Sequence, residues 1–400
     1  KNLLKNMECN AYKSLNKRLA ILFMTLTLFS LANAKRVITG DERTELYFHL
    51  LEGKRIALYS NHTGLANGKH IVDILKENKF DVTTILSPEH GFRGTADAGE
   101  RVGDSVDEKT NIPIISMYKF GREGIDSTTA ARFDILVVDI QDVGLRFYTY
   151  YITMWRLMDS CAKYGKLVIV LDRPNPNGFY VDGPILDMKY RSGVGWLPIP
   201  IVHGMTLGEL ALMINGEGWL TDKRKCELTV IPCKNYKHST LYELPIPPSP
   251  NLPNIKSIYL YPSTCFFEGT VMSLGRGTSL PFQVYGHPDY KGSNYSFTPQ
   301  SISGAKNPPL LGKKCYGVDL SDTDDKYIRK QGIDLSYVID AYKNLNIGSK
   351  FFTSFFDLLA GCSYIREMIE QGCDADEIKA RWQDDVTKFK KQRAPYLIYK

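Results

Sequence analysis

The chain has 400 residues, of which 43% are hydrophobic, 12% aromatic and 24% charged. This composition is typical of folded globular proteins and excludes disordered, collagen-like and coiled-coil chains. The formal net charge is +6, but residues 1–34 contain five Lys or Arg and one Glu, so the remainder carries only +2. With no stripe of Lys and Arg interleaved with aromatic residues, this charge argues against a nucleic-acid partner. We expect a small or polymeric molecule as ligand.

The N-terminal segment has the pattern of a secretory signal peptide. Basic residues precede an apolar run at 19–31, and small residues ending at Ala34 provide a cleavage site. The run is shorter than the ~20 apolar residues that span a bilayer. We expect translation to start at Met7 and cleavage to follow Ala34. The mature protein is then exported, periplasmic or extracellular, and not held in the membrane.

Seven cysteines follow this segment, and none lies in a C-x-x-C or zinc-spaced Cys/His pattern, so we expect no structural metal. Two pairs are close enough in sequence to form disulfides in an oxidising compartment, Cys226 with Cys233 and Cys362 with Cys373. The alternative is that the cysteines are small buried apolar residues.

From Arg55 onward, short apolar runs rich in β-branched residues alternate with helical patterns. Strands are expected at 55–60, 82–86, 112–117, 135–139 and 167–171. Unbroken apolar runs of this kind are typical of strands buried on both faces of a parallel sheet. Helices are expected at 71–79 and at 148–164, where Gly165 provides a stop. The alternation predicts an α/β fold, with a Rossmann-like, doubly wound, mostly parallel sheet over residues 35–254.

Two further strands are expected, at 199–202, in an edge position because of Pro200, and at 227–231. Between them, Thr206 and Glu209 have the spacing of a capping box that begins a helix. The five prolines of residues 245–253 exclude a helix and a central strand. Helical patterns near 351–371 and 376–391 then predict a second, smaller α+β domain over residues 255–400, which completes the cleft.

Polar side chains follow five of the predicted strands at the point where each ends. In an open parallel sheet, ligands bind beyond the carboxyl ends of the strands. Helix capping needs one side chain per helix, whereas here three or four follow some strands. We therefore expect these side chains to line one crevice. In strand order they are Asn61 and His62; Glu89 and His90; Asp139, Asp142, Arg146 and Tyr148; Arg173 and Asn175; and His203.

The chain lacks the motifs of several common enzymes: G-x-G-x-x-G, G-x-x-x-x-G-K-[ST], G-x-S-x-G and H-E-x-x-H are all absent. Carboxylate chemistry assisted by Arg and Asn remains. A glycosidase uses one carboxyl group to protonate the leaving oxygen, and a second group to activate water, attack, or steer a substrate nucleophile. Glu89 is the expected general acid, because its Pro-fixed, Gly-flanked loop near Phe92 can raise a glutamate pKa. Asp139, Asp142 and Glu268 compete for the second role.

These strand-end motifs, together with three further segments, carry a resemblance to a known family. The segments are Ser60-Asn-His-Thr-Gly64, Ser87-Pro-Glu-His-Gly91, Asp139-Ile-Gln-Asp-Val-Gly144 through Thr149, Leu171-Asp-Arg-Pro-Asn-Pro176, Pro200-Ile-Val-His-Gly-Met-Thr206, Pro247-Pro-Ser-Pro-Asn251 with Pro253, Glu268-Gly-Thr270 and Gly275-Arg-Gly-Thr278. In sequence and in order they resemble the exo-β-N-acetylmuramidase family of glycoside hydrolases, formerly catalogued as a domain of unknown function. The resemblance implies a Rossmann-like domain joined to a smaller C-terminal domain. It also implies removal of terminal N-acetylmuramic acid from the non-reducing ends of peptidoglycan fragments, with Glu89 as proton donor.

Such a substrate suits the polar residues. N-acetylmuramic acid bears a lactyl carboxylate, which a planar guanidinium binds with two hydrogen bonds. Arg146, Arg173 and Arg276 are candidates, although the first two are equally suited to ion pairs with nearby Asp residues. The acetamido group could act as an internal nucleophile, oriented by Asp139 or Asp142. The candidates for binding sugar hydroxyls and the acetamide are Asn61, His62, His90, Tyr148, Asn175, His203 and Asn251.

We therefore expect an exo-acting glycoside hydrolase that needs no cofactor and no metal. Two alternatives are a non-catalytic muropeptide-binding protein and a metal-dependent hydrolase. The latter would use three histidines, at positions 62, 90 and 203, with Asp139 and Asp142. These five residues lack the compact spacing of metal ligands.

Overall fold

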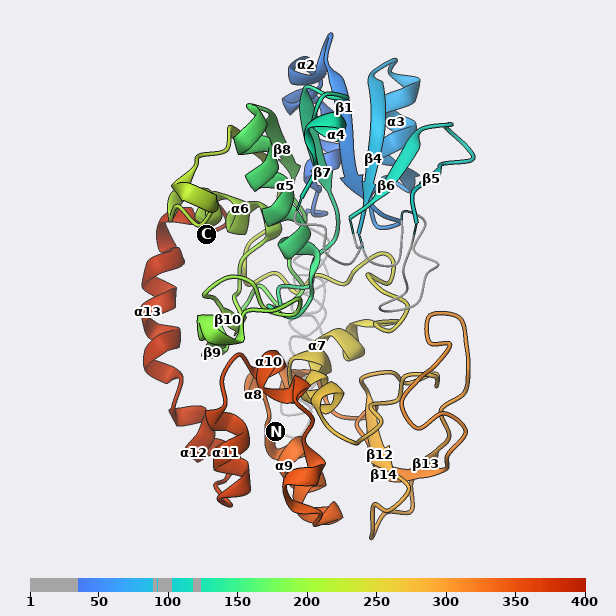
Figure 1. Cartoon of the computed structure of the whole chain (residues 1–400), viewed down its shortest axis with the longest axis vertical. Coiled ribbons are helices and arrows are strands. Elements are labelled where there is room, and N and C mark those ends of the chain that lie inside the picture. Colours follow the sequence, from blue (N-terminus) through green and yellow to red (C-terminus); the bar gives the residue numbers. More distant parts are fainter. Residues whose placement is uncertain (1–34, 89–91, 93–102, 118–123) are drawn as a thin grey trace, which may run out of the picture. The chain divides into compact units, whose positions relative to one another are not determined.

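The computed structural model describes residues 35–88, 92, 103–117 and 124–400 (Figure 1). Its central sheet has the strand order β11-β8-β7-β1-β4-β6-β5, and every neighbouring pair is parallel except β5 with β6. Apart from β5, this is the 3-2-1-4-5-6 order of doubly wound folds. The predicted Rossmann-like sheet is therefore confirmed. Its strands are β1 Arg55–Ser60, β4 Asp81–Ser87, β5 Ser105–Val106, β6 Pro113–Ser116, β7 Ile135–Asp139, β8 Leu167–Leu171 and β11 Leu228–Ile231.

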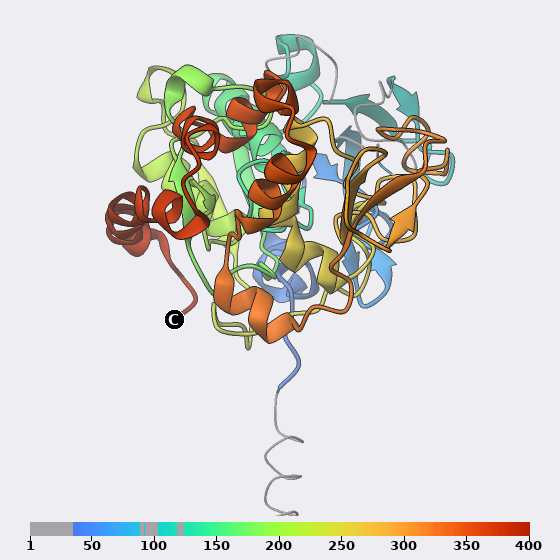
Figure 2. The same cartoon turned by 90° about the horizontal axis from the view of Figure 1, so that it is seen from below.

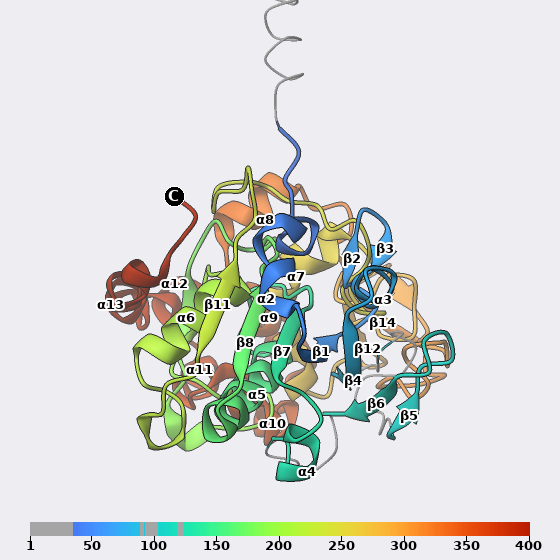
Figure 3. The ribbon, with the colours of Figure 1, turned by 90° about the horizontal axis from the view of Figure 1, so that it is seen from above.

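Alternate residues of the buried strands pack on opposite faces of this sheet. Ala57 and Leu136 belong to the core that includes residues of the helices α4, α5 and α6. Ile56 and Val137 belong to a second core with residues of α2 and α3. Figure 3 shows α4 and α5 on one side of the row of strands and α2 and α3 on the other. Burial on both faces is why these strands are continuous apolar runs. The helices are α2 Phe48–Leu51, α3 Ile71–Glu77, α4 Ser127–Ala130, α5 Tyr150–Tyr164 and α6 Leu207–Gly216.

Most predicted elements occur within one or two residues of their expected positions. Gly165, in the left-handed conformation at φ 63°, ends α5, and Thr206 with Glu209 forms the capping box of α6. The strand expected at 199–202 needs a correction. As β10 (Pro200–Val202), it pairs antiparallel with β9 (Asp182–Ile185) in a separate two-stranded sheet. A hairpin of β2 (Leu65–Ala66) and β3 (Lys69–His70) was not predicted.

The C-terminal part combines helices with a three-stranded antiparallel sheet, in the order β12-β14-β13. Figure 2 shows its helices, in orange and red, beside this short sheet. The predicted α+β character is confirmed. Each of the two long helical patterns, at 351–371 and 376–391, forms two shorter helices. In the first pattern, Gly361, at φ 73°, ends the helix Phe355–Ala360. Contacts join residues 39–400 into one unit, and the boundary at residue 254 stays a prediction. The elements are α7 Ile255–Thr264, β12 Val284–His287, β13 Ser296–Phe297, β14 Cys315–Asp319, α8 Asp325–Gln331, α9 Ser336–Leu345, α10 Phe355–Ala360, α11 Tyr364–Glu370, α12 Ala375–Ala380 and α13 Gln383–Arg393.

The cysteines of the described residues are all free thiols. Six are buried and Cys373 is partly exposed, so the buried-thiol alternative holds and neither candidate disulfide is formed. Among the helices that the structure describes, none has the length and apolar character to span a bilayer. Over the same residues, no group of three or more His, Cys, Asp or Glu side chains is arranged to hold a metal ion. The predicted signal peptide lies outside the described residues.

Candidate active site

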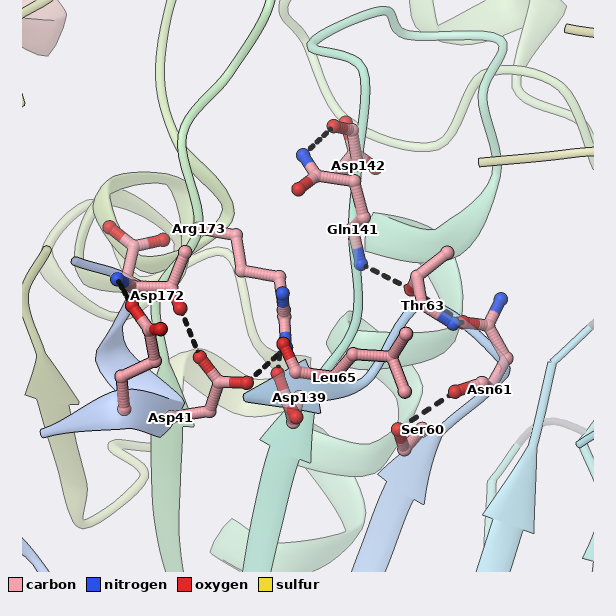
Figure 4. Close-up of polar contacts among 12 residues, drawn as sticks. Asp41, Ser60, Asn61, Thr63, Leu65, Asp139, Gln141, Asp142, Asp172 and Arg173 are labelled. Atoms are coloured by element: carbon pink, nitrogen blue, oxygen red, sulfur yellow. Dashed lines mark hydrogen bonds and ion pairs between the residues drawn. The ribbon is translucent and has the colours of Figure 1, made fainter. Parts of the chain in front are cut away.

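The carboxyl ends of β1 and β7 lie side by side, because Ser60 pairs with Asp139. This is where the strand order reverses, and it is the usual ligand site of doubly wound sheets. The polar residues after β1, β7 and β8 meet at this edge, as Figure 4 shows. Glu89 and His90 follow β4, the neighbour of β1 on its other side, but both lie outside the described residues.

Arg173 is held between two buried aspartates (Figure 4). Its Nε donates to Oδ1 of Asp139 at 2.7 Å, and its Nη2 donates to Oδ2 of Asp41 at 2.5 Å. Burial raises the pKa of Asp41 to about 7, opposed by the charge of Arg173. Burial likewise raises the pKa of Asp139. The guanidinium is therefore engaged as an ion-pair partner, which was one of its two predicted roles. Asp41 was missed, because nothing in its local sequence indicates a site.

Asp142 has no cationic partner among the described residues, unlike Asp139. Its Oδ1 accepts from the backbone N–H of Gly144 at 2.7 Å. Its Oδ2 is buried and accepts no hydrogen bond from any group that the structure describes. Burial raises the pKa of Asp142 to about 7, opposed by backbone hydrogen bonds from Gly144 and Val143. A buried oxygen in this state costs free energy unless a proton, water or ligand satisfies it.

Asn175 supports the loop that carries Asp142. Its Nδ2 donates to the carbonyl of Met205 at 2.8 Å, and its Oδ1 accepts from the backbone of Asn177 at 2.8 Å. Gly144 lies against this side chain at φ 77°, and a Cβ at that position would be 2.1 Å from Nδ2 of Asn175. Asn175 was a candidate for binding the sugar, but in the structure its side-chain amide forms hydrogen bonds that stabilise this loop.

Arg146 is also engaged inside the protein, with no exposed surface. Its guanidinium donates to four backbone carbonyls, those of Pro184, Ile199, Leu359 and Ala360, at 2.6–3.1 Å. Burial lowers its pKa to about 10, so it stays charged at neutral pH. Arg146 was a candidate for binding the substrate carboxylate; in the structure its guanidinium instead joins the chain segments that contribute these carbonyls.

Two of the remaining candidates shape the backbone at the sheet edge. Asn61 accepts at Oδ1 from the backbone N–H of Thr63 at 2.9 Å and donates from Nδ2 to the hydroxyl of Tyr150 at 3.1 Å. Nε2 of His62 lies 2.9 Å from the carbonyl of Pro247. These contacts attach the end of β1 to α5 and to the proline-rich segment.

His203 is a buried, neutral imidazole. Its Nδ1 accepts from the backbone N–H of Met205 at 3.2 Å, which places the proton on Nε2. Burial, reinforced by the charge of Arg393, lowers its pKa to about 3. Nε2 is buried without a hydrogen-bond partner among the described residues.

A small pocket of about 60 Å³ brings together three predicted residues, Tyr148, Asn251 and Arg276. The hydroxyl of Tyr148 donates to the carbonyl of Pro248 at 2.9 Å, so the segment after β7 contacts the proline-rich segment. The other lining residues were not predicted; the closely spaced aromatic residues at 147–151 are a signal that could have found some of them. They are Phe147, Thr149, Tyr150, Ser249, Leu252, Tyr261 and Phe282.

Glu268 lies beside this pocket and binds Arg276. Its Oε1 accepts from Nε of Arg276 at 2.9 Å and from Nη2 at 2.6 Å. Because Tyr150 lines the pocket and also binds Asn61, the pocket adjoins the carboxyl end of β1. The sheet edge therefore offers, at Asp142, a buried carboxyl with no cationic partner among the residues that the structure describes. The pocket that Arg276 lines adjoins this edge.

Comparisons with known proteins place the chain in a family. The family described as "Exo-beta-N-acetylmuramidase NamZ" matches with its N-terminal model at residues 56–256 and with its C-terminal model at residues 259–399. The peptidoglycan beta-N-acetylmuramidase NamZ of Bacillus subtilis (strain 168) is 39% identical over 394 residues, covering 92% of each chain. A crystal structure of a DUF1343 family protein from Bacteroides fragilis NCTC 9343 is 63% identical, with a TM-score of 0.86, covering 92% of this chain and 99% of that one. A second DUF1343 family structure from the same bacterium is 29% identical, with a TM-score of 0.76, covering 91% and 99%. This chain belongs to the exo-β-N-acetylmuramidase NamZ family.

Proposed function

We propose that this protein is an exo-acting glycoside hydrolase that releases terminal N-acetylmuramic acid from the non-reducing ends of peptidoglycan fragments. Membership of the family over nearly the whole of residues 56–399 supports the reaction and the substrate class. The observation that carries the proposal in the structure is the carboxyl-rich sheet edge beside an arginine-lined pocket. Glycoside hydrolysis needs carboxyl groups in two roles.

In this proposal, Glu89 is the general acid. It gives its proton to the glycosidic oxygen while the bond from that oxygen to C1 breaks. The loop that contains Glu89 leaves β4 at Ser87, and β4 is parallel to β1. The loop therefore begins at the same edge of the sheet as Asn61 and Asp142, which supports a shared site.

Asp142 is our choice for the second group. Oδ2 accepts no hydrogen bond from the described residues in either Asp139 or Asp142. Asp139 and Glu268 each bind an arginine, however, whereas Asp142 has no cationic partner within the described residues. A carboxylate there would accept a proton from the attacking water or a hydrogen bond from the substrate's acetamido N–H. Either role places negative charge beside the developing positive charge at C1.

The proposal includes export from the cytoplasm, to the periplasm or beyond. It rests on the basic, apolar and small-residue pattern of residues 13–34. Peptidoglycan lies outside the cytoplasmic membrane, so the substrate class agrees with that destination.

The test is an assay of residues 35–400 on a chromogenic β-N-acetylmuramide, followed by product sizing on longer glycan strands. We expect release of the chromophore and stepwise release of the monosaccharide, without internal cleavage. Saturable binding with no turnover would instead support the binding-protein alternative. Loss of turnover on treatment with a chelator would support the metal-dependent one.

A further inference from the structure

The structure separates the three arginines that could bind the lactyl carboxylate of the substrate. Arg146 has no exposed surface and donates to four carbonyls. Arg173 is 5% exposed and bridges two aspartates. Arg276 has an 18% exposed side chain, binds one carboxylate and lines a pocket. By exposure and by remaining hydrogen-bonding capacity, Arg276 is the one that a ligand can reach.

The backbone around Arg276 fixes the direction of its side chain. Gly275 and Gly277 flank it at φ 82° and φ 80°, in the left-handed region that disfavours other residues. A Cβ at Gly275 would be 2.6 Å from the carbonyl oxygen of Leu280, and one at Gly277 would be 2.5 Å from that of Gln300. Any residue larger than glycine would clash at positions 275 and 277, so these two glycines allow the tight loop that carries Arg276.

The conformation of Phe282 is a second, independent indication that the fold constrains the position of the Arg276 guanidinium. Phe282 is a bulky residue at φ 61°, a conformation that costs roughly 1–3 kcal/mol and is concentrated at functional sites. Its buried ring lies 5.0 Å from the guanidinium carbon of Arg276 and packs edge-to-face on Tyr261. A strained backbone position therefore lies at the residue whose ring contacts Arg276.

Glu268 occupies only one edge of the guanidinium. Arginine has five N–H donors, and Glu268 accepts from Nε and from Nη2. The remaining donors, including both on Nη1, have no acceptor among the described residues. Asn251 and Tyr148 line the same pocket as Arg276.

We propose that Arg276 binds the lactyl carboxylate of the terminal N-acetylmuramic acid and so makes the enzyme prefer this sugar to N-acetylglucosamine. The inference rests on the proposed function and adds the residue that decides its substrate specificity. A guanidinium held by Glu268 and Phe282 binds a carboxylate without losing further side-chain freedom, which strengthens charge-assisted hydrogen bonds. N-acetylglucosamine has no lactyl group, so it leaves these donors unsatisfied.

The experiment compares kcat/KM for three chromogenic substrates: the β-N-acetylmuramide, its lactyl amide and the β-N-acetylglucosaminide. The wild-type protein is expected to prefer the free acid. We expect Arg276→Gln to reduce the ratio of muramide to glucosaminide turnover on the order of 10- to 100-fold, mainly through KM, because charged hydrogen bonds are lost. Arg276→Lys keeps the positive charge but loses the paired N–H donors of the guanidinium. Its ratio of muramide to glucosaminide turnover is therefore expected to lie between those of the wild-type protein and Arg276→Gln.

Arg329→Gln is the matched control, because Arg329 also lies over an aromatic ring, that of Tyr259, and does not line the pocket. It is expected to keep the wild-type ratio. If the wild-type protein cleaves no muramide, the proposed function itself fails. If it cleaves the acid and the amide equally well, or if Arg276→Gln folds and keeps the wild-type preference, Arg276 only positions Glu268 and this inference is overturned. The wild-type comparison decides the matter even if Arg276→Gln does not fold.

Discussion

Nη2 of Arg146 donates to the carbonyl oxygen of Ala360 at 2.6 Å, which joins the loop after β7 to the carboxyl end of α10. A cation suits a helix carboxyl end, where unpaired carbonyls gather. Gly361 closes that helix, and a Cβ there would lie 2.5 Å from Nη2 of Arg146. The buried Arg146 therefore holds the loop after β7 against the C-terminal helices.

Arg146→Met is therefore expected to destabilise the protein. Removing the guanidinium removes four buried hydrogen bonds, and the free energy of unfolding should fall by about 2–4 kcal/mol. Urea denaturation measures this change. Lys189→Met is the control, because Lys189 forms an exposed ion pair with Asp187; it is expected to leave the denaturation midpoint unchanged. Equal midpoints for Arg146→Met and the wild-type protein would contradict the fastening role.

Glu89→Gln tests the general acid. The amide cannot donate a proton to the leaving oxygen, so kcat on a poorly activated muramide should fall on the order of 10²-fold or more. Substrates with very acidic leaving groups need less protonation and should lose less. Glu108→Gln, at an exposed position, is the control. Full activity of Glu89→Gln on both kinds of substrate would remove this assignment.

Asp142→Asn tests the buried carboxyl through pH. The pKa of Asp142 is about 7 in the folded protein, raised by burial from its ordinary value of 3.8. Between these values the folded state binds more protons than the unfolded state, so the stability of the wild-type protein falls as pH rises. Asn does not titrate. The stability of Asp142→Asn relative to wild type should therefore increase from about pH 4 to about pH 7 and then become constant.

Denaturation of both proteins across pH 4–9 measures this difference. Asp41 and Asp172, whose pKa values are also raised by burial, are present in both proteins and cancel in the comparison. A difference that does not change with pH would show that Asp142 titrates normally. If its carboxylate has the proposed second role, the variant should also lose most of its turnover.

Gly144→Ala tests the loop geometry beside Asp142. Alanine at φ 77° is strained, and its Cβ would overlap the side-chain amide of Asn175. Gly165→Ala is the matched control, because Gly165 has φ 63° and a Cβ there would meet no atom of the described residues within 4 Å. We expect Gly165→Ala to cost about 1 kcal/mol with normal turnover. Gly144→Ala should cost more and should lower kcat, because the backbone N–H of Gly144 orients Asp142; equal effects of the two would contradict this.

The sequence was sufficient to predict most of the central sheet. The strands at 55–60, 135–139 and 167–171 are as predicted, because burial on both faces demands uninterrupted apolar runs. The strand at 199–202 was harder, since a short run beside Pro200 gives no information about its partner. Its pairing with β9 depends on a segment whose Gly and Pro residues do not resemble a strand.

The sequence alone also determined that polar residues follow the strands, and parallel pairing then required them to gather at one edge. It did not determine what each one does there. Arg146, Arg173 and Arg276 have the same chemistry, and only the tertiary structure assigned carbonyls to the first, two aspartates to the second and a pocket to the third. The physical reason is that the function of a guanidinium depends on the acceptors brought to it from distant parts of the chain. Asp41 lies 132 positions from Arg173 and Ala360 lies 214 positions from Arg146, and no local pattern encodes either contact.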